Sequence, residues 1–136
     1  MHRILSLIIV LLALADMVLG FGFLINPVSS GARLGVAAVA AGPSGAAGLA
    51  TMRADFTAFF VVAAAFMIVA ARRRQGALLA PPLGLFVIAF SGRLVDLLVS
   101  GPYPGFAVPM AYEMGHVALL GAAINWWPWR RTAGSP

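Results

Sequence analysis

The chain has no cysteine and no lysine, and only four of its 136 residues are acidic. The lack of cysteine excludes disulfides, thiolate metal sites and cysteine nucleophiles within it. Only 10% of its residues are charged and 62% are hydrophobic, whereas soluble domains are about 25% charged. With a mean hydropathy of +0.98, too few polar side chains are present to cover a water-facing surface. The composition therefore predicts an integral membrane protein.

Four apolar runs have about the ~17–25 residues that a helix needs to cross a bilayer. They cover residues 4–25, 54–71, 77–100 and 106–127. A backbone inside the hydrocarbon must satisfy its own hydrogen bonds, which favours helices. We therefore predict an all-α bundle of four transmembrane helices in one membrane domain, residues 1–136. Residues 26–53 are rich in Gly, Ala and Ser, and we interpret them as a loop on the membrane surface, with or without a short helix, or packed over the bundle.

The basic residues, all nine of them arginine, predict the orientation of the chain. Six lie near span ends on the side of the two termini, namely Arg3, Arg72, Arg73, Arg74, Arg130 and Arg131. Three lie toward the other side, namely Arg33, Arg53 and Arg93. Arginines accumulate in cytoplasmic loops, so both termini are predicted inside. We read the arginines as topology determinants and predict no nucleic-acid partner. Arginine without lysine, together with abundant Ala and Gly, is typical of GC-rich bacteria, which predicts a multi-pass protein of the bacterial inner membrane.

The first apolar run has a second interpretation. Ala13-Leu14-Ala15 follows a short basic start and resembles a signal-peptidase site. The apolar run continues through residues 17–25, whereas a cleavage site usually leads into polar chain. We favour a retained first helix, with cleavage as the alternative.

Ionisable residues inside or beside the apolar runs are the candidate ligand-binding site. A charge near the centre of a membrane helix costs ~2.5–3.5 kcal/mol, so such groups normally face the bundle interior and pair. By depth they gather in the outer half, where they predict an outward-open polar pocket with two arginines as cationic centres and four acidic residues as counter-ions. The alternative is that these charges only hold the helices together. The residues are Asp16, Arg53, Asp55, Arg93, Asp96, Glu113 and His116.

Spacing links some of these residues in pairs. Arg93 and Asp96 lie three residues apart on one helix face, and so do Glu113 and His116. A Glu-x-x-His pair also occurs in di-iron bundles, but that site needs the pair twice and two further glutamates. Pigment ligation by His116 is a weaker alternative, since His2 lies at the other face of the membrane. A proton relay through Asp16, Glu113 and His116 is also weaker, since the inner half offers no ionisable continuation. We predict no metal and no cofactor.

Glycine and proline positions predict local packing. Pro81 and Pro82 are start signals for the third helix. Gly20-Phe21-Gly22-Phe23 is spaced for close helix contact. Pro109 removes a backbone hydrogen bond and predicts a kink in the fourth helix.

Three stretches, "TMRADFTAFFVVAAAFMIVAARR", "FSGRLVDLLVSGPYPG" and "MAYEMGHVALLGAAI", resemble the bacterial membrane family known as domain of unknown function 4345, a four-helix group akin in outline to DoxX-like proteins. In that family an Arg opens the second helix, an Arg precedes a Gly-Pro turn late in the third, and a Glu lies in the fourth. Arg53, Arg93 and Glu113 match these positions. The family tends to have Tyr-Gly-Gly soon after the first Arg, where this chain has residues 55–58, "DFTA". The resemblance covers roughly residues 50–124 and implies a four-helix inner-membrane fold with no known activity.

Three functional hypotheses follow. The leading one is a non-enzymatic membrane protein that binds a lipophilic or amphiphilic molecule in the polar cluster, or contacts a partner through it. The second is an accessory or assembly subunit of a larger membrane complex. The third is an enzyme on a lipid or quinone-like substrate, with Glu113 or His116 as acid or base and the arginines holding an anion. The predicted partners are the lipid bilayer, a lipophilic small molecule, and a membrane protein or second copy of the chain.

Overall fold

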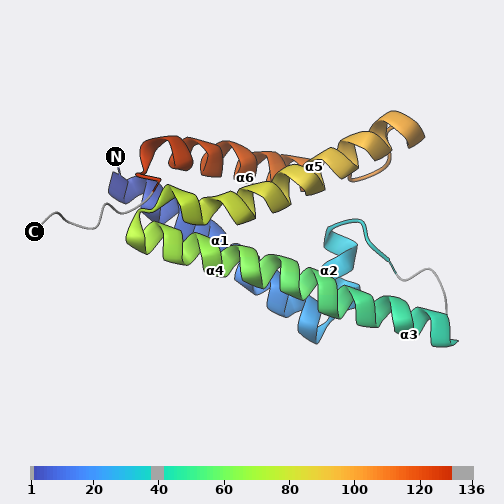
Figure 1. Ribbon diagram of the computed structural model, residues 1–136. Helices are drawn as coiled ribbons and strands as arrows, with labels where there is room; N and C mark the ends of the chain where they lie inside the picture. The colour runs from blue at the N-terminus through green and yellow to red at the C-terminus, as the bar shows by residue number, and fades with distance from the viewer. Residues whose placement is uncertain (1, 38–41, 130–136) are drawn as a thin grey trace, which may run out of the picture.

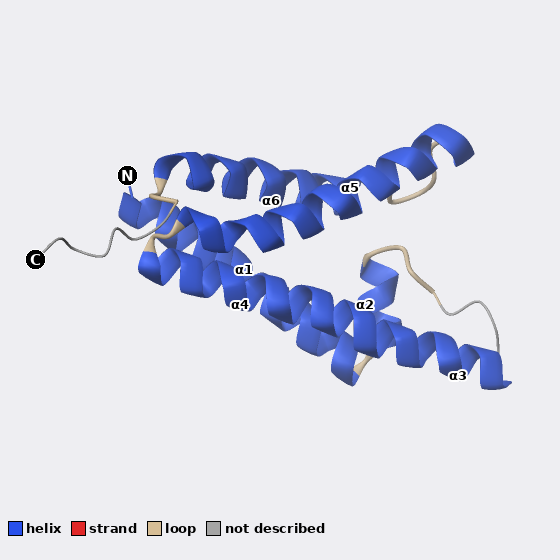
Figure 2. Cartoon of the chain, in the orientation of Figure 1, coloured by secondary structure: helices blue, strands red, loops and turns tan. Residues whose placement is uncertain are grey.

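The computed structural model describes residues 2–37 and 42–129, and this part of the chain contains helices and no strand (Figure 2). Four helical segments are long and apolar enough to cross a membrane, which confirms the predicted all-α class and the number of long apolar helices. The elements are α1 (His2–Ile25), α2 (Pro27–Arg33), α3 (Gly42–Thr51), the π-helix η1 (Met52–Phe56), α4 (Thr57–Arg73), the 3₁₀-helix η2 (Gly76–Leu79), α5 (Ala80–Ser100) and α6 (Ala107–Trp126).

The bundle is closed at one end and splayed at the other (Figure 1). At the closed end, α1 begins, α4 turns into α5 and α6 ends. From there α1 packs along α4, α5 pairs with α6, and the α5–α6 hairpin diverges from α3 and α2. We call the splayed side the open end, and every ionisable residue of the predicted pocket lies toward it or at mid-bundle.

The contact between α1 and α4 is made close by small residues. Gly20 lies against α4, where an added Cβ would be 2.9 Å from Val61 Cγ2. Thr57 Oγ1 donates a hydrogen bond to the Gly20 carbonyl oxygen at 3.1 Å. Small side chains let membrane helices approach closely, and the predicted close contact at Gly20 is confirmed. The core residues that meet along this contact are Leu5, Ile9, Ala13 and Phe23 of α1 and Ala63, Ala64, Met67, Ala70 and Ala71 of α4.

Residues 26–53, interpreted as a loop with or without a short helix, contain more helix than expected, because most of the described part is helical. Asn26 caps α2 by accepting a hydrogen bond from the Ser29 amide at 3.1 Å, and Pro27 occupies the first helical position. Farther along, α3 runs through η1 into α4, so the apolar helix extends over Gly45–Arg73 and not 54–71. The stretch after Pro43 holds many alanines and no proline, so no residue in it stops the helix.

Turn residues determine where α5 and α6 begin and end. Pro81 and Pro82 lie in the first turn of α5, as predicted, and Gly101 ends that helix with φ of 81°. The Gly76 amide donates to the Pro128 carbonyl oxygen at 2.9 Å and fastens the closed end. The predicted kink at Pro109 is wrong, because α6 begins at Ala107. Amides in the first turn have no helical partner, so Pro109 removes no hydrogen bond there.

Candidate functional site

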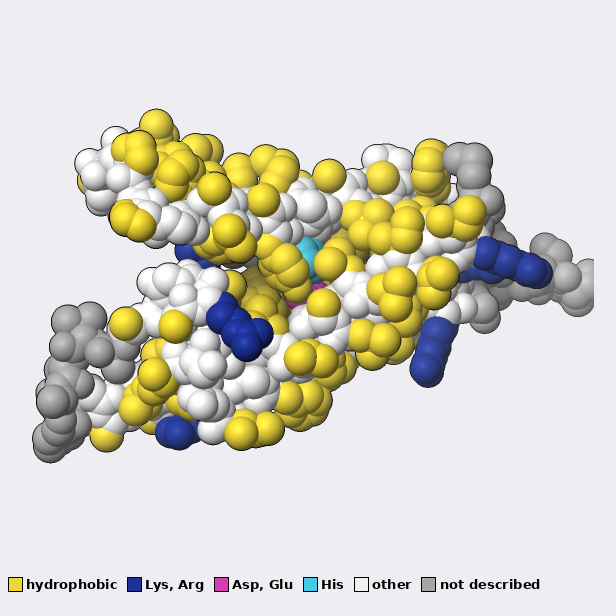
Figure 3. All heavy atoms as spheres, turned by 180° about the vertical axis from the view of Figure 1, so that it is seen from behind, with side chains coloured by type: hydrophobic (Ala, Val, Ile, Leu, Met, Phe, Trp, Pro, Cys, Tyr) yellow, Lys and Arg dark blue, Asp and Glu magenta, His cyan; other side chains and the backbone are white. Residues whose placement is uncertain are grey.

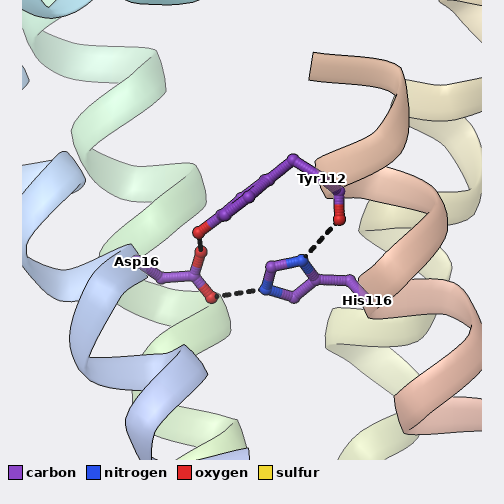
Figure 4. A network of polar contacts seen from close by, with 3 residues as sticks. All are labelled: Asp16, Tyr112 and His116. Atoms are coloured by element: carbon purple, nitrogen blue, oxygen red, sulfur yellow. Dashed lines mark hydrogen bonds and ion pairs between the residues drawn. The ribbon is translucent and has the colours of Figure 1, made fainter. Parts of the chain in front are cut away.

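A buried polar network joins α1 to α6 at mid-bundle (Figure 4). The Tyr112 hydroxyl donates to Asp16 Oδ1 at 2.5 Å. Asp16 Oδ2 faces His116 Nε2 at 3.1 Å, and His116 Nδ1 faces the Tyr112 carbonyl oxygen at 2.9 Å. The side chains of Asp16 and His116 are fully buried. The network therefore satisfies both carboxylate oxygens and both ring nitrogens within the protein.

The geometry of this network determines its charge. A carbonyl oxygen only accepts, so His116 Nδ1 carries a proton. A second proton lies between His116 Nε2 and Asp16 Oδ2, since these atoms bond only if one of them donates. Whichever atom holds that proton, the Asp16–His116 pair has no net charge. Phe86 stacks on the imidazole with ring centroids 3.8 Å apart and closes it from that side.

A second polar pair, toward the open end, joins α5 to α6. Arg93 Nε donates to Glu113 Oε1 at 2.7 Å. The side chains of Arg93 and Glu113 are 22% and 9% exposed, so most of the surface of each is covered by protein. The other carboxylate oxygen, Glu113 Oε2, is buried without a hydrogen-bond partner in the part of the chain that the structure describes. An unsatisfied buried acceptor costs about 1–3 kcal/mol, which makes this pair a poor solution for stability alone.

A cavity of about 210 Å³ lies beside this pair. Five of its eleven lining residues are aromatic, and Phe59 of α4 packs edge-on against Phe86 of α5 with centroids 5.4 Å apart. A cavity of ~150 Å³ in another protein's core holds benzene, so this one accommodates a single ring with small substituents. The lining residues are Leu34, Asp55, Phe56, Phe59, Phe60, Phe86, Ala89, Arg93, Pro109, Tyr112 and Glu113.

A larger groove of about 790 Å³ adjoins the cavity between α1, α2 and α6. It shares Leu34, Pro109 and Tyr112 with the cavity wall, so these residues lie between the two spaces. From behind, the molecule is hollowed between two ridges of hydrophobic side chains, with basic side chains at the edge (Figure 3). Apolar residues of α1, such as Leu14 and Val18, line the groove, and Arg33 of α2 also contributes to it.

The π-helix η1 forms one side of the cavity. It contributes Asp55 and Phe56 to the wall, and Phe56 also stacks on Phe23 of α1 with centroids 4.7 Å apart. Single π-helical turns inside α-helices occur frequently at functional sites, because the extra residue redirects the side chains around it. The wider turn therefore lies at the cavity, and none of its residues lines the larger groove.

The predicted pocket residues divide into three groups. Asp16 pairs with His116, and Arg93 pairs with Glu113. Asp55 is exposed and lines the cavity. The other two predicted members, Arg53 and Asp96, do not join the cluster.

Arg53 is exposed on η1 and lines neither the cavity nor the groove. Asp96 is exposed on α5 and accepts a hydrogen bond from the Ser100 hydroxyl at 2.9 Å. Asp96 does not pair with Arg93, because the guanidinium bonds Glu113 of α6 and Asp96 bonds Ser100 on the exposed side of α5. The expectation of one pocket with two cationic centres is thereby corrected to one ion pair and one separate neutral network.

Sequence reasoning missed Tyr112 and the aromatic wall. Tyr112 lies four residues before His116, so the two share a helix face, a signal that was available from spacing. Phe56, Phe59 and Phe60 likewise follow the helical repeat of one face. Nothing in a single sequence says that these faces meet Phe86 across the bundle.

Within residues 2–37 and 42–129, no three His, Cys, Asp or Glu side chains lie close enough together to hold a metal ion. Comparisons of the chain with family models, curated proteins and solved structures find no match. The resemblance to domain of unknown function 4345 therefore stays a prediction.

Proposed function

We propose that this chain is a non-enzymatic membrane protein that binds one amphiphilic small molecule at the open end of its bundle. The head of the ligand occupies the aromatic cavity beside Arg93 and Glu113, and its apolar chain lies in the adjoining groove. The observation that carries the proposal is the Arg93–Glu113 pair on the wall of a ring-sized cavity.

The energetic argument for binding compares this pair with the rest of the core. Polar contacts between membrane helices contribute only ~0.6 kcal/mol on average, less than the cost of placing charges in the hydrocarbon. The Asp16–His116 network limits this cost by being neutral and fully bonded. The Arg93–Glu113 pair keeps one acceptor unbonded next to an aromatic cavity. Such a combination of apolar wall and few polar groups is typical of small-molecule sites.

The shape of the groove favours an elongated amphiphilic ligand and not a compact one. It adjoins the cavity at Leu34, Pro109 and Tyr112, and its α1 side is apolar. A ligand with a ring at one end and a hydrocarbon chain at the other fits this pair of spaces.

We also propose the orientation and location predicted from the sequence, a bacterial inner-membrane protein with both termini in the cytoplasm. Arg3 and Arg72–Arg74 lie at the closed end, whereas Arg130 and Arg131 lie outside the described residues. The open end then faces outward, and ligand enters from that side. A retained α1 is supported because Leu5, Ile9 and Ala13 are buried in the core.

The proposal is tested by native mass spectrometry of the protein purified in mild detergent, comparing wild type with Arg93→Ala. We expect wild type to carry one small molecule of defined mass and Arg93→Ala to lose it. The matched control is Arg53→Ala, which removes the same charge from an exposed position outside the cavity and groove. This variant should keep the ligand.

Two results would contradict the proposal. Wild type carrying only heterogeneous bulk lipid would show that the cavity holds no specific ligand. Equal loss from Arg53→Ala and Arg93→Ala would show that net charge, and not the cavity, retains the molecule.

The second candidate, an accessory subunit of a membrane complex, is favoured by α5. Only 6% of the most apolar stretch of Gly76–Ser100 is buried, against 28–33% in the other three long helices. A stoichiometric protein partner in the same mass spectra would support this candidate. The enzyme hypothesis has weaker support, since His116 is fully buried and lines neither space, which leaves Glu113 as the only proposed acid or base beside the cavity.

A further inference from the structure

We infer that the ligand head is an aromatic ring bearing a hydroxyl group, and that this hydroxyl bridges Arg93 and Glu113. The inference rests on the proposed function and specifies the chemical class of the ligand. It follows from the hydrogen-bonding character of the pair, the unbonded carboxylate oxygen and the size and composition of the cavity wall.

The polar groups of the pair have opposite requirements. A guanidinium only donates hydrogen bonds and has five N–H groups, of which Nε alone serves Glu113 Oε1. A carboxylate only accepts, and Glu113 Oε2 has no donor among the described residues. A ligand hydroxyl accepts from the guanidinium and donates to the carboxylate with the same oxygen atom. A hydroxyl is therefore the smallest neutral group that meets both requirements.

A carbonyl, an ether and an ammonium each fail one of these requirements. A carbonyl or ether oxygen accepts from Arg93 but donates nothing to Glu113. An ammonium donates to Glu113 but places a second cation close to the Arg93 guanidinium, and like charges at short range repel strongly where the dielectric constant is low. Because Glu113 Oε2 is buried, the carboxylate has to turn toward the cavity to accept a hydrogen bond from the hydroxyl. The new hydrogen bond compensates that rotation.

The cavity wall selects the ring. Five aromatic residues line a space of about 210 Å³, and edge-on pairs form among them: Phe56, Phe59, Phe60, Phe86 and Tyr112. Aromatic rings prefer such offset and edge-on neighbours, which add to the effect of burying their area. A flexible hydrocarbon head would fill the same volume without these contacts.

The test measures binding of para-pentylphenol, para-pentylanisole and pentylbenzene to the purified protein in mild detergent. The three probes share ring and chain, but only the phenol both donates and accepts. Dissociation constants come from the ligand-dependent rise in Tm. We expect para-pentylphenol to bind about tenfold tighter than para-pentylanisole, as the loss of one hydrogen bond predicts. The advantage should disappear in the double variant Arg93→Met/Glu113→Leu, which removes both partners at similar volume.

The outcomes separate this inference from the proposed function. If phenol and anisole bind wild type equally well, the cavity takes a ring but the hydroxyl inference is overturned. If the phenol keeps its advantage in the double variant, the hydroxyl binds elsewhere and the inference is also overturned. If none of the three probes raises Tm, the ring assignment fails, while the mass spectrometry of wild type and Arg93→Ala still decides whether a ligand is bound. The comparison of probes on wild type decides the matter even if the double variant does not fold.

Discussion

Asp16 on α1 and His116 on α6 are 100 residues apart in the sequence, and their side chains meet at 3.1 Å inside the bundle. Tyr112 adds a hydrogen bond to the same carboxyl group, so one acidic residue holds two side chains of the facing helix. Asp16 therefore links the first and last long helices through buried polar contacts. Tyr112 connects this network to the proposed binding site, because it lines both the cavity and the groove.

Replacing Asp16 by Ala should destabilise the protein by about 2 kcal/mol. The change leaves the Tyr112 hydroxyl and His116 Nε2 without their partner, and an unsatisfied buried polar group costs about 1–3 kcal/mol. Polar contacts between membrane helices contribute less than this on average. We therefore expect a loss near the lower end of the range for two unsatisfied groups. Unfolding in mixed detergent and dodecyl sulfate micelles, followed by circular dichroism, measures the difference.

The control for this prediction is Asp96→Ala, which removes a carboxylate from an exposed position where it bonds only Ser100. Surface substitutions usually stay within ±0.5 kcal/mol. If Asp16→Ala and Asp96→Ala unfold at the same dodecyl sulfate fraction, the network does not contribute to stability as the contacts indicate.

Much of the fold was predictable from composition, because apolar runs of this length favour helices long enough to cross a bilayer. The first, third and fourth predicted helices agree with α1, α5 and α6 to within a few residues. The second helix was predicted too short because hydropathy falls before Ala54, whereas helix formation does not depend on hydropathy. Alanines continue the helix through α3 and η1, beyond the stretch that the membrane requires.

The sequence predicted which ionisable residues are buried better than it predicted which of them pair. Burial of Asp16, Glu113 and His116 follows from the cost of leaving them in lipid. Which opposite charge meets which acid depends on the relative rotation and splay of the helices, and a single sequence does not contain this information. Arg93 thus pairs with Glu113 of α6 and not with Asp96 on its own helix.

Replacing Gly20 by Ala should separate α1 from α4 and cost about 1–3 kcal/mol, the usual range for overpacking. An added Cβ lies 2.9 Å from Val61 Cγ2 and 3.3 Å from the Val61 backbone nitrogen, so the backbone has to move. The matched control is Gly84→Ala on α5, where no atom lies within 4 Å of the new Cβ. We expect the control to be neutral or slightly stabilising, because Ala favours helix over Gly. Equal unfolding curves for the two variants would contradict the close packing at Gly20.

The Arg93–Glu113 pair should contribute more to ligand binding than to the stability of the fold. Arg93→Met and Glu113→Leu each leave one charge unpaired, and breaking a buried pair costs about 3–5 kcal/mol, less here because Arg93 is partly exposed. Arg93→Met should cost more, because it strands the more deeply buried Glu113. The double variant should recover most of the loss, since apolar replacement of a whole pair is often neutral.

A double-mutant cycle from the same unfolding assay measures the interaction free energy between Arg93 and Glu113. If the double variant is as unstable as the sum of the two single changes, the charges act independently and the pair has no joint role. Recovery of stability together with loss of the bound molecule would show that the two charges are retained for binding.

The orientation can be tested directly because the chain has no cysteine to label in the background. Pro104→Cys places a thiol in the exposed turn between α5 and α6 at the open end, and Gln75→Cys places one between α4 and η2 at the closed end. With both termini in the cytoplasm, as the arginines predict, a charged membrane-impermeant maleimide should label the first thiol on intact spheroplasts. The second thiol should react only after permeabilisation. The reverse pattern would place the cavity opening in the cytoplasm, so the ligand would have to be sought among cytoplasmic amphiphiles. Labelling of both thiols on intact spheroplasts would contradict a bilayer between the two ends of the bundle.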